Sequence, residues 1–80
     1  MRVEILGTGC SKCRLTEKVV RHVVDELGMG IEVCKVDDVE DIMERGVMMT
    51  PAVAINGEIQ IMGRVPTEEE LRELLAGGQG

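Results

Sequence analysis

The amino-acid sequence predicts one small α/β domain, in which a four-stranded mixed sheet carries helices on both faces. Short β-branched runs alternate with segments whose apolar residues recur at helical spacing, and an Asn-Gly pair separates the last two runs. The 80 residues are 44% apolar and 30% charged, which suits one globular unit and leaves no room for a second domain. The expected element order is β-α-β-α-β-β-α.

The first three elements form a β-α-β unit. Residues 3–6 are mostly apolar and end at Gly7-Thr8-Gly9, which predicts a short strand. A helix follows to Leu27, and Gly28 stands where glycine ends many helices. Residues 31–36 are rich in β-branched side chains and form the second strand. The helical stripe expected to face the core consists of Leu15, Val19, Val20, Val23, Val24 and Leu27.

A second helix and a third strand follow. Asp37 or Asp38 caps a helix that ends at Gly46, because a short acidic side chain accepts bonds from the free amides of the first turn. The inward stripe of this helix is expected to be Val39, Ile42 and Met43. Thr50-Pro51 precedes an apolar strand at residues 52–55, and proline is tolerated at the first position of a strand.

The chain closes with a hairpin and a helix. Asn56-Gly57 is the strongest short-range hairpin signal, so residues 58–62 run back antiparallel to the preceding strand. Ile59 and Ile61 alternate with polar residues, which predicts that both lie on one face of an edge strand. Thr67-x-x-Glu70 has the spacing of a capping box. The apolar face of this last helix consists of Leu71, Leu74 and Leu75.

The order of elements fixes the sheet. The β-α-β opening requires a right-handed crossover and a parallel first pair, whereas the hairpin makes the last pair antiparallel. Helices on both faces explain why residues 52–55 are apolar throughout. We expect one domain over residues 1–76 and a flexible tail at 77–80, where the sequence reads Gly-Gly-Gln-Gly.

Composition excludes several classes of function. The net charge is −6 and no Phe, Tyr or Trp occurs, so the chain lacks both the positive surface and the stacking platforms of nucleic-acid binders. No apolar run reaches the roughly 18 residues of a membrane span, and the N-terminus lacks the pattern of a signal peptide. Three cysteines is an odd number for a disulfide-stapled secreted domain. We therefore expect a cytoplasmic monomer without a cofactor.

Two cysteines lie where the first strand meets the first helix, in the order Cys10-Ser11-Lys12-Cys13. Free amides at a helix N-terminus stabilise an anion, and Lys12 and Arg14 add positive potential, so a thiolate is favoured there. On a helical wheel of about 100° per residue, Cys13 falls inside the apolar arc and Cys10 just outside it. This predicts that Cys10 is the exposed attacking sulfur and Cys13 the sheltered resolving one.

Other interpretations of the pair remain open. A metal-binding module for Zn or Cu would use the two thiolates, with Cys34 and His22 completing four ligands on paper. Small copper-carrying domains also place such a pair after their first strand, but they continue directly into a hairpin, whereas here a helix intervenes. A static disulfide, or an adaptor that binds partners without turnover, are further alternatives. His22 is expected to be solvated, and Cys34 to be a packed side chain away from the pair.

With these motifs, the sequence resembles the thioredoxin/glutaredoxin superfamily, and most of all its small glutaredoxin-like thioredoxin-fold members from archaea and bacteria. The resemblance extends from Val3 to Leu75 and rests on the Cys-x-x-Cys after the first strand, Thr50-Pro51, Asn56-Gly57 and Gly63. It implies a thioredoxin-like fold and a protein-disulfide oxidoreductase.

The resemblance also implies roles for individual residues. Cys10 would be the nucleophile and Cys13 the resolving thiol. Pro51 would be cis and packed against the disulfide, and the backbone of Thr50 would pair with an incoming peptide. Glu4 stands six residues before Cys10, where thioredoxins carry a buried acid that assists proton transfer at the resolving cysteine. Such an acid would have a raised pKa if buried, unless it reaches solvent or pairs with a Lys or Arg.

The chain departs from the two best-known patterns of the superfamily. No Trp precedes Cys10 and no Gly-Pro separates the cysteines, unlike in standard thioredoxins. Gly63 is followed by Arg64-Val65-Pro66 instead of the Gly-Asp that glutaredoxins use for glutathione. We therefore expect disulfide-containing protein substrates, with a flavoprotein reductase or a protein dithiol as electron donor. Met48 and Met49 beside Thr50 suit a surface for varied apolar peptides or the filling of gaps in the core.

Overall fold

Four strands form one mixed sheet in the computed structural model, which describes residues 1–28 and 30–77. The strands are β1 (Arg2–Leu6), β2 (Glu32–Val36), β3 (Ala52–Ile55) and β4 (Glu58–Met62), and their spatial order is β2-β1-β3-β4. β1 pairs parallel with β2 and antiparallel with β3, and β3 pairs antiparallel with β4. The predicted order of elements and the mixed sheet are therefore confirmed.

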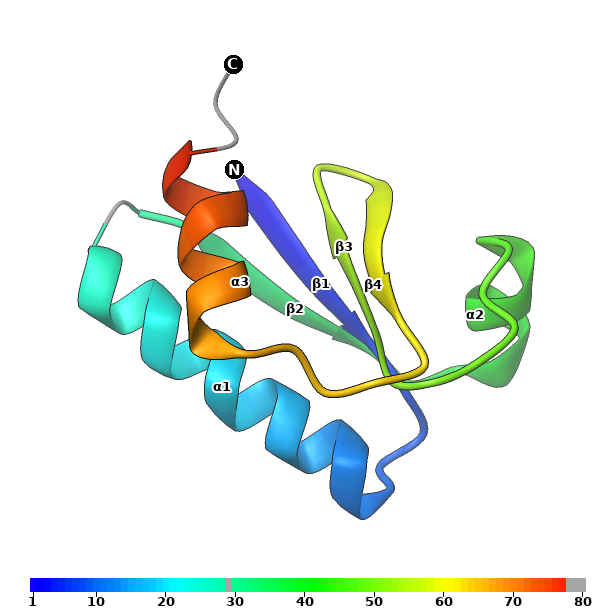
Figure 1. The fold of residues 1–80 in the computed structure, drawn as a ribbon. Helices are drawn as coiled ribbons and strands as arrows, with labels where there is room; N and C mark the ends of the chain where they lie inside the picture. The colour runs from blue at the N-terminus through cyan, green and yellow to red at the C-terminus, as the bar shows by residue number, and fades with distance from the viewer. Residues whose placement is uncertain (29, 78–80) are drawn as a thin grey trace.

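Helices cover both faces of this sheet (Figure 1). α1 (Ser11–Leu27) and α3 (Glu68–Arg72) lie side by side on one face, and α2 (Val39–Glu44) lies on the other. A π-helical turn, Glu73–Gly77, extends α3. Of the predicted flexible tail at 77–80, residues 78–80 lie outside the described part of the chain. None of the helices within the described residues has the length and apolar character needed to cross a membrane.

Two apolar clusters, one on each face, hold the layers together. The larger cluster lies between the sheet and the pair α1 and α3, and the smaller one lies between the sheet and α2. The fully buried Leu71 and Leu75 belong to the larger cluster. The other buried members of the larger cluster are Val3, Ile5, Val20, Val23, Ile31, Val53, Ile55 and Ile61. The smaller cluster consists of Leu6, Ile42, Val47, Ala52 and Ala54.

Several helix ends lie at the capping residues that the sequence predicts. The cap of α2 is Asp38, whose Oδ1 accepts a bond of 2.8 Å from the amide of Glu40. Gly28 ends α1 in the left-handed conformation, with φ of 57°. The capping box of α3 is complete, because Thr67 and Glu70 each accept a bond from the other's backbone amide. Each signal satisfies backbone groups that a helix end leaves free.

The helical stripes are narrower than the sequence suggests. Leu15 is 51% exposed because the buried face of α1 is centred on Thr16, Val20 and Val23, and Leu15 lies beyond the edge of that face. In α2 only Ile42 is buried, whereas Val39 and Met43 are 55% and 67% exposed. Predicting these three as core residues was wrong, since a helix that packs on one face of a sheet turns only a narrow side toward it.

A β-bulge separates two isoleucines that simple alternation assigns to one face. Val53 pairs with Ile61 and Ala54 pairs with Ile59, so Gln60 is an extra residue in β4. Ile61 therefore packs in the larger cluster, whereas Ile59 packs against the smaller one on the other face. The prediction that Ile59 and Ile61 share a face was wrong, because a bulge shifts the period of two.

The bulge predicts unequal effects of two matched substitutions. Ile61→Ala should lower the free energy of unfolding by about 2–5 kcal/mol, because Ile61 is 4% exposed and its removal leaves a cavity in the larger cluster. Ile59→Ala should cost less than half as much, since Ile59 is only partly buried. Urea unfolding with unchanged m-values measures both. Equal losses would contradict the observed register.

Candidate active site

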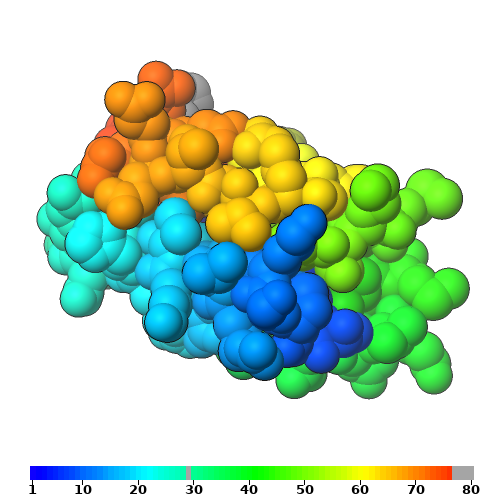
Figure 2. All heavy atoms as spheres, turned by 60° about the horizontal axis from the view of Figure 1, so that its bottom comes forward, coloured from blue at the N-terminus to red at the C-terminus, as the bar shows by residue number. Residues whose placement is uncertain are grey.

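Three segments of the chain meet at one edge of the sheet. Leu6 at the end of β1 pairs with Ala52 at the start of β3, and Ala52 pairs with Met62 at the end of β4. The Cys10 loop, the Thr50-Pro51 segment and the segment beginning at Gly63 therefore leave the sheet at the same edge. Figure 2 shows them together on one face, as the blue, light green and yellow atoms in its centre.

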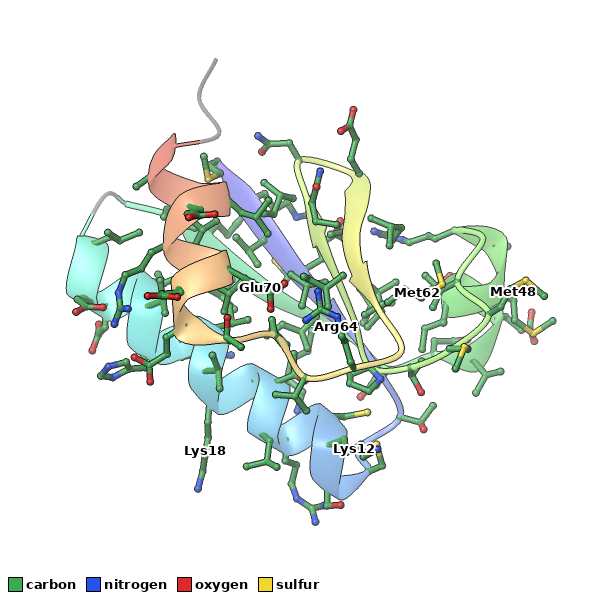
Figure 3. All side chains as sticks on the ribbon, in the orientation of Figure 1. Lys12, Lys18, Met48, Met62, Arg64 and Glu70 are labelled. Atoms are coloured by element: carbon green, nitrogen blue, oxygen red, sulfur yellow. The ribbon has the colours of Figure 1, made fainter. Side chains whose placement is uncertain are left out.

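The start of α1 holds the two sulfurs together. Cys10 is the N-cap, and its Sγ accepts a bond of 3.3 Å from the amide of Cys13. The two Sγ atoms are 2.7 Å apart, and both cysteines are free thiols. Arg14 secures the preceding loop, because its guanidinium donates to the carbonyl of Gly9 at 2.8 Å. Lys12 lies in the same first turn (Figure 3).

The two sulfurs differ in exposure, and the pKa of the exposed one is lowered. Cys10 is exposed, whereas Cys13 is 6% exposed, as the helical wheel predicts. The pKa of Cys10 is lowered, first by a hydrogen bond from the Cys13 thiol and next by the backbone amide of Cys13. The backbone amide of Lys12 adds to this effect. The sulfur whose thiolate form is favoured is therefore the one that faces solvent.

Gly7 makes room for the buried sulfur. A Cβ at position 7 would overlap with Sγ of Cys13, so any other residue there would force the Cys13 side chain out of its place. Sequence reasoning treated Gly7 only as a turn residue. Its position three residues before Cys10 carries no signal for this contact, since the contact forms only when the helix packs back against the strand.

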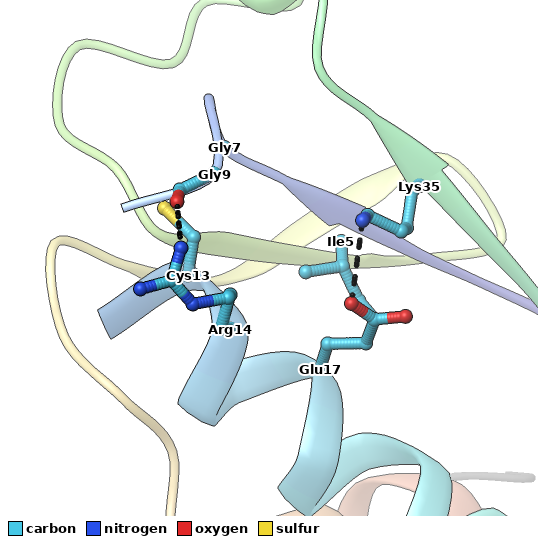
Figure 4. A pocket seen from close by; sticks show the side chains of 7 residues that line it. All are labelled: Ile5, Gly7, Gly9, Cys13, Arg14, Glu17 and Lys35. Atoms are coloured by element: carbon cyan, nitrogen blue, oxygen red, sulfur yellow. Dashed lines mark hydrogen bonds and ion pairs between the residues drawn. The ribbon is translucent and has the colours of Figure 1, made fainter. Parts of the chain in front are cut away.

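A small cavity lies next to Cys13. Its volume is about 20 Å³, room for one water molecule. Figure 4 shows Glu17 and Lys35 on one side of it, with an ion pair of 3.4 Å between them. The pKa of Glu17 is lowered by a bond from Arg21 and then by Lys35. The lining residues are Ile5, Gly7, Gly9, Cys13, Arg14, Glu17 and Lys35.

The Thr50-Pro51 segment has the form that the resemblance implies. The peptide bond between them is cis, and Pro51 is fully buried. The carbonyl of Pro51 accepts a bond of 2.8 Å from the amide of Gly63, which joins this segment to the end of β4. Thr50 is exposed, and Met49 beside it is 62% exposed. A backbone edge and an apolar side chain are thus open to a ligand near the cysteines.

Glu4 faces the α2 side of the sheet, away from α1. It is 4% exposed, and its carboxylate lies 2.6 Å from Nη1 of Arg45 and 3.9 Å from Nη2 of Arg2. The bond from Arg45 lowers the pKa of Glu4, so the raised pKa expected for a buried acid is not found. Pairing with an arginine, the alternative that the sequence left open, is what the structure shows. Arg45 lies 41 positions from Glu4 in the sequence, and no sequence pattern predicts that the two form an ion pair.

The four-ligand set that was possible on paper is not assembled. Cys34 lies on β2 opposite Glu4, and His22 is on the surface of α1 beside Glu68. Across residues 1–28 and 30–77, no group of three or more His, Cys, Asp or Glu side chains is arranged to hold a metal ion. Among the described residues, the Cys10 and Cys13 thiols therefore have no third His, Cys, Asp or Glu side chain arranged with them to hold a metal ion.

The fold is thioredoxin-like, and an exposed cysteine with a lowered pKa is hydrogen-bonded to a buried cysteine. This combination defines a thiol-disulfide oxidoreductase. The model of the thioredoxin domain family matches residues 1–76, and the chain belongs to this family. It is similar to a thioredoxin of Methanothermobacter thermautotrophicus, with 41% identity over 76 residues that cover 95% of this chain and 99% of the relative. A thioredoxin of Methanocaldococcus jannaschii is 44% identical over 73 residues, which cover 91% of this chain and 84% of the relative.

The bond between the sulfurs predicts how Cys13 substitutions act on Cys10. Cys13→Ala removes the thiol donor, so the pKa of Cys10 should rise toward that of an ordinary cysteine. Cys13→Ser keeps a donor, so the rise should be smaller. Thiolate absorbance against pH measures both, with little background because the chain has no aromatic residue. The same Cys10 titration in both variants would show that the thiol bond has no effect.

The Glu4–Arg45 pair predicts a pH-dependent loss of stability in Glu4→Gln. The folded-state pKa of Glu4 is lowered, so its stabilisation is fully present above about pH 4.5 and is lost as the pH falls further. Glu4→Gln should therefore cost about 1–3 kcal/mol at neutral pH, and the difference from the parent should shrink in acid. Urea unfolding across pH measures this, with the exposed Glu69→Gln as control. A difference that does not change with pH would contradict the pairing.

Proposed function

We propose that Cys10 and Cys13 reduce disulfides in protein substrates by two successive exchanges. The Cys10 thiolate attacks one sulfur of the substrate disulfide, which forms a Cys10–substrate disulfide and releases one substrate thiolate. Cys13 then loses its proton and attacks Sγ of Cys10, which forms the Cys10–Cys13 disulfide and releases the second thiolate. The substrate gains two electrons and the pair is oxidised. The 2.7 Å separation of an exposed and a buried sulfur is the observation that carries this proposal.

Other residues of the edge hold the substrate in place. Thr50 is exposed next to the buried Pro51, which suits the pairing of its backbone with an incoming extended peptide. Lys12 is exposed in the first turn of α1, where its amide supports the Cys10 thiolate and its ammonium adds positive potential. In these roles Thr50 contacts the substrate peptide, and Lys12 acts on the Cys10 thiolate.

For Glu4 we propose a positioning role. Glu4 stands six residues before Cys10, and Arg45 stands six residues before Pro51. Their ion pair therefore ties the strand that leads to the cysteines to the segment that leads to the cis-proline. A proton relay to Cys13 is less favoured, because Glu4 faces the α2 side of the sheet and its carboxylate is bound to Arg45.

The electron donor is proposed to be a flavoprotein reductase or a protein dithiol. Arg64 follows Gly63 and forms an ion pair with Glu70, so this segment differs from the glutathione-binding pattern of glutaredoxins. All three cysteines are free, and the odd one, Cys34, is half-buried on β2, which suits a monomer working in the reducing cytoplasm.

Trapping tests the assigned roles. Cys13→Ser should accumulate mixed disulfides through Cys10, because the resolving thiol is absent, and the parent protein should be alkylated first at Cys10. Mass spectrometry of trapped species identifies the cysteine, and Cys34→Ser serves as the matched control that should leave trapping unchanged.

Turnover of a disulfide substrate should be sustained by a flavoprotein reductase or a dithiol and not by glutathione. Trapping through Cys34, or a stoichiometric Zn or Cu ion on the reduced protein, would contradict the proposal.

A further inference from the structure

A cluster of exposed apolar side chains extends from the Thr50-Pro51 segment onto α2. Seven large apolar side chains are well exposed among the described residues, and five of them belong to this cluster. Met48 is 90% exposed, the most of all. We call the cluster the methionine surface, and it consists of Val39, Met43, Met48, Met49 and Met62.

The members of the methionine surface are neighbours in space. Val39 and Met43 are four residues apart on α2 and so lie on the same side of the helix. Met43 and Met48 line one open pocket. The Met49 side chain lies against Gly63, the residue that follows Met62. Figure 3 shows Met48 beside α2 and Met62 on the neighbouring strand β4.

These side chains do not serve the core. Ile42 supplies the buried contact of α2 with the sheet, and Val47 supplies that of the following loop. Single exposed apolar residues are ordinary on a protein surface, whereas a contiguous group marks an interaction site. Methionine is unbranched and polarisable, so it adapts to partner surfaces of different shapes.

Acidic residues surround this apolar surface. Glu40, Asp41 and Glu44 lie on α2 itself, and Asp37 and Asp38 precede it. Within the described residues, none of these five carboxylates forms an ion pair with a lysine or arginine. The cation of the segment, Arg45, is bound to the buried Glu4 and interacts less strongly with Asp41. The rim of the methionine surface is therefore negative, and it complements a positive partner.

We propose that the methionine surface binds an apolar segment carrying lysine or arginine, next to the reacting cysteine of a disulfide-containing partner protein. This inference rests on the proposed function, since Met48 and Met49 directly precede Thr50, whose backbone we propose pairs with the substrate peptide. Apolar side chains of the partner cover the methionines, and its basic side chains meet the acidic rim. The surface thereby selects partners by the sequence that flanks their disulfide.

Three cyclic peptides with the same intramolecular disulfide test this selection. One has leucine and lysine flanks, the second has glutamate in place of lysine, and the third has serine in place of leucine. Reduced protein is mixed with each peptide and quenched in acid, which gives a rate constant for reduction. The leucine-lysine peptide should react about tenfold faster than either of the others, and its advantage over the glutamate peptide should shrink at high salt. Equal rates for the three peptides would overturn the proposal.

Variants then locate the selection on the molecule. Met43→Gln with Met48→Gln should lower the rate for the leucine-lysine peptide about tenfold, and Glu40→Gln with Glu44→Gln should remove the preference for lysine over glutamate. Leu15→Gln and Glu69→Gln are matched controls, being an exposed apolar residue on α1 and an exposed acid on α3. If the surface variants keep the parent's peptide preferences, the proposed surface is wrong.

The rate at which the protein reduces hydroxyethyl disulfide distinguishes a failure of this proposal from a failure of the proposed function. This disulfide has no flanking segment, so all of the surface variants should reduce it at the parent rate. If the parent fails to reduce both this compound and the peptides, the oxidoreductase function itself fails. If the parent reduces the compound while the three peptides react alike, only the methionine surface fails.

Discussion

The arrangement of the site depends on one hydrogen bond, between the buried Sγ of Cys13 and the exposed Sγ of Cys10, and this bond lowers the pKa of Cys10. The bond exists because Cys10 caps α1 and Cys13 lies one turn further along the helix, on its inward face. It also needs Gly7, where a side chain would occupy the place of the Cys13 sulfur. A strand, a tight loop and a helix N-terminus thus combine to keep one sulfur in solvent, where its thiolate form is favoured, and its partner sulfur buried beneath it.

The sheet supplies the rest of the site through its register. Because Leu6, Ala52 and Met62 pair across three strands, the segments next to them gather at one edge. The bond from the Gly63 amide to the Pro51 carbonyl joins two of these segments along the sheet edge, and the Glu4–Arg45 ion pair ties β1 to the end of α2 on the α2 face. The cis-proline segment leaves the sheet at the same edge as the Cys10 loop although some 40 residues separate them in the sequence.

Features that depend on neighbouring residues could be predicted from the sequence. The capping box at Thr67, the hairpin at Asn56-Gly57 and the exposures of Cys10 and Cys13 follow from local spacing. Features that depend on distant contacts could not. The bulge at Gln60 reflects the fit of β4 to β3, and the state of Glu4 depends on an arginine supplied by the end of α2. The exposure of Leu15 and Met43 was missed because periodicity shows which residues share a helix face, but not how much of that face the sheet covers.

The most direct test of the central hydrogen bond is the titration of each cysteine in the unaltered reduced protein. Nuclear magnetic resonance of isotopically labelled cysteine follows the Cβ shift of Cys10, Cys13 and Cys34 separately against pH. We predict that Cys10 titrates with a midpoint below the value of about 8.5 for a free cysteine. A Cys10 midpoint at or above that value would contradict the hydrogen bond.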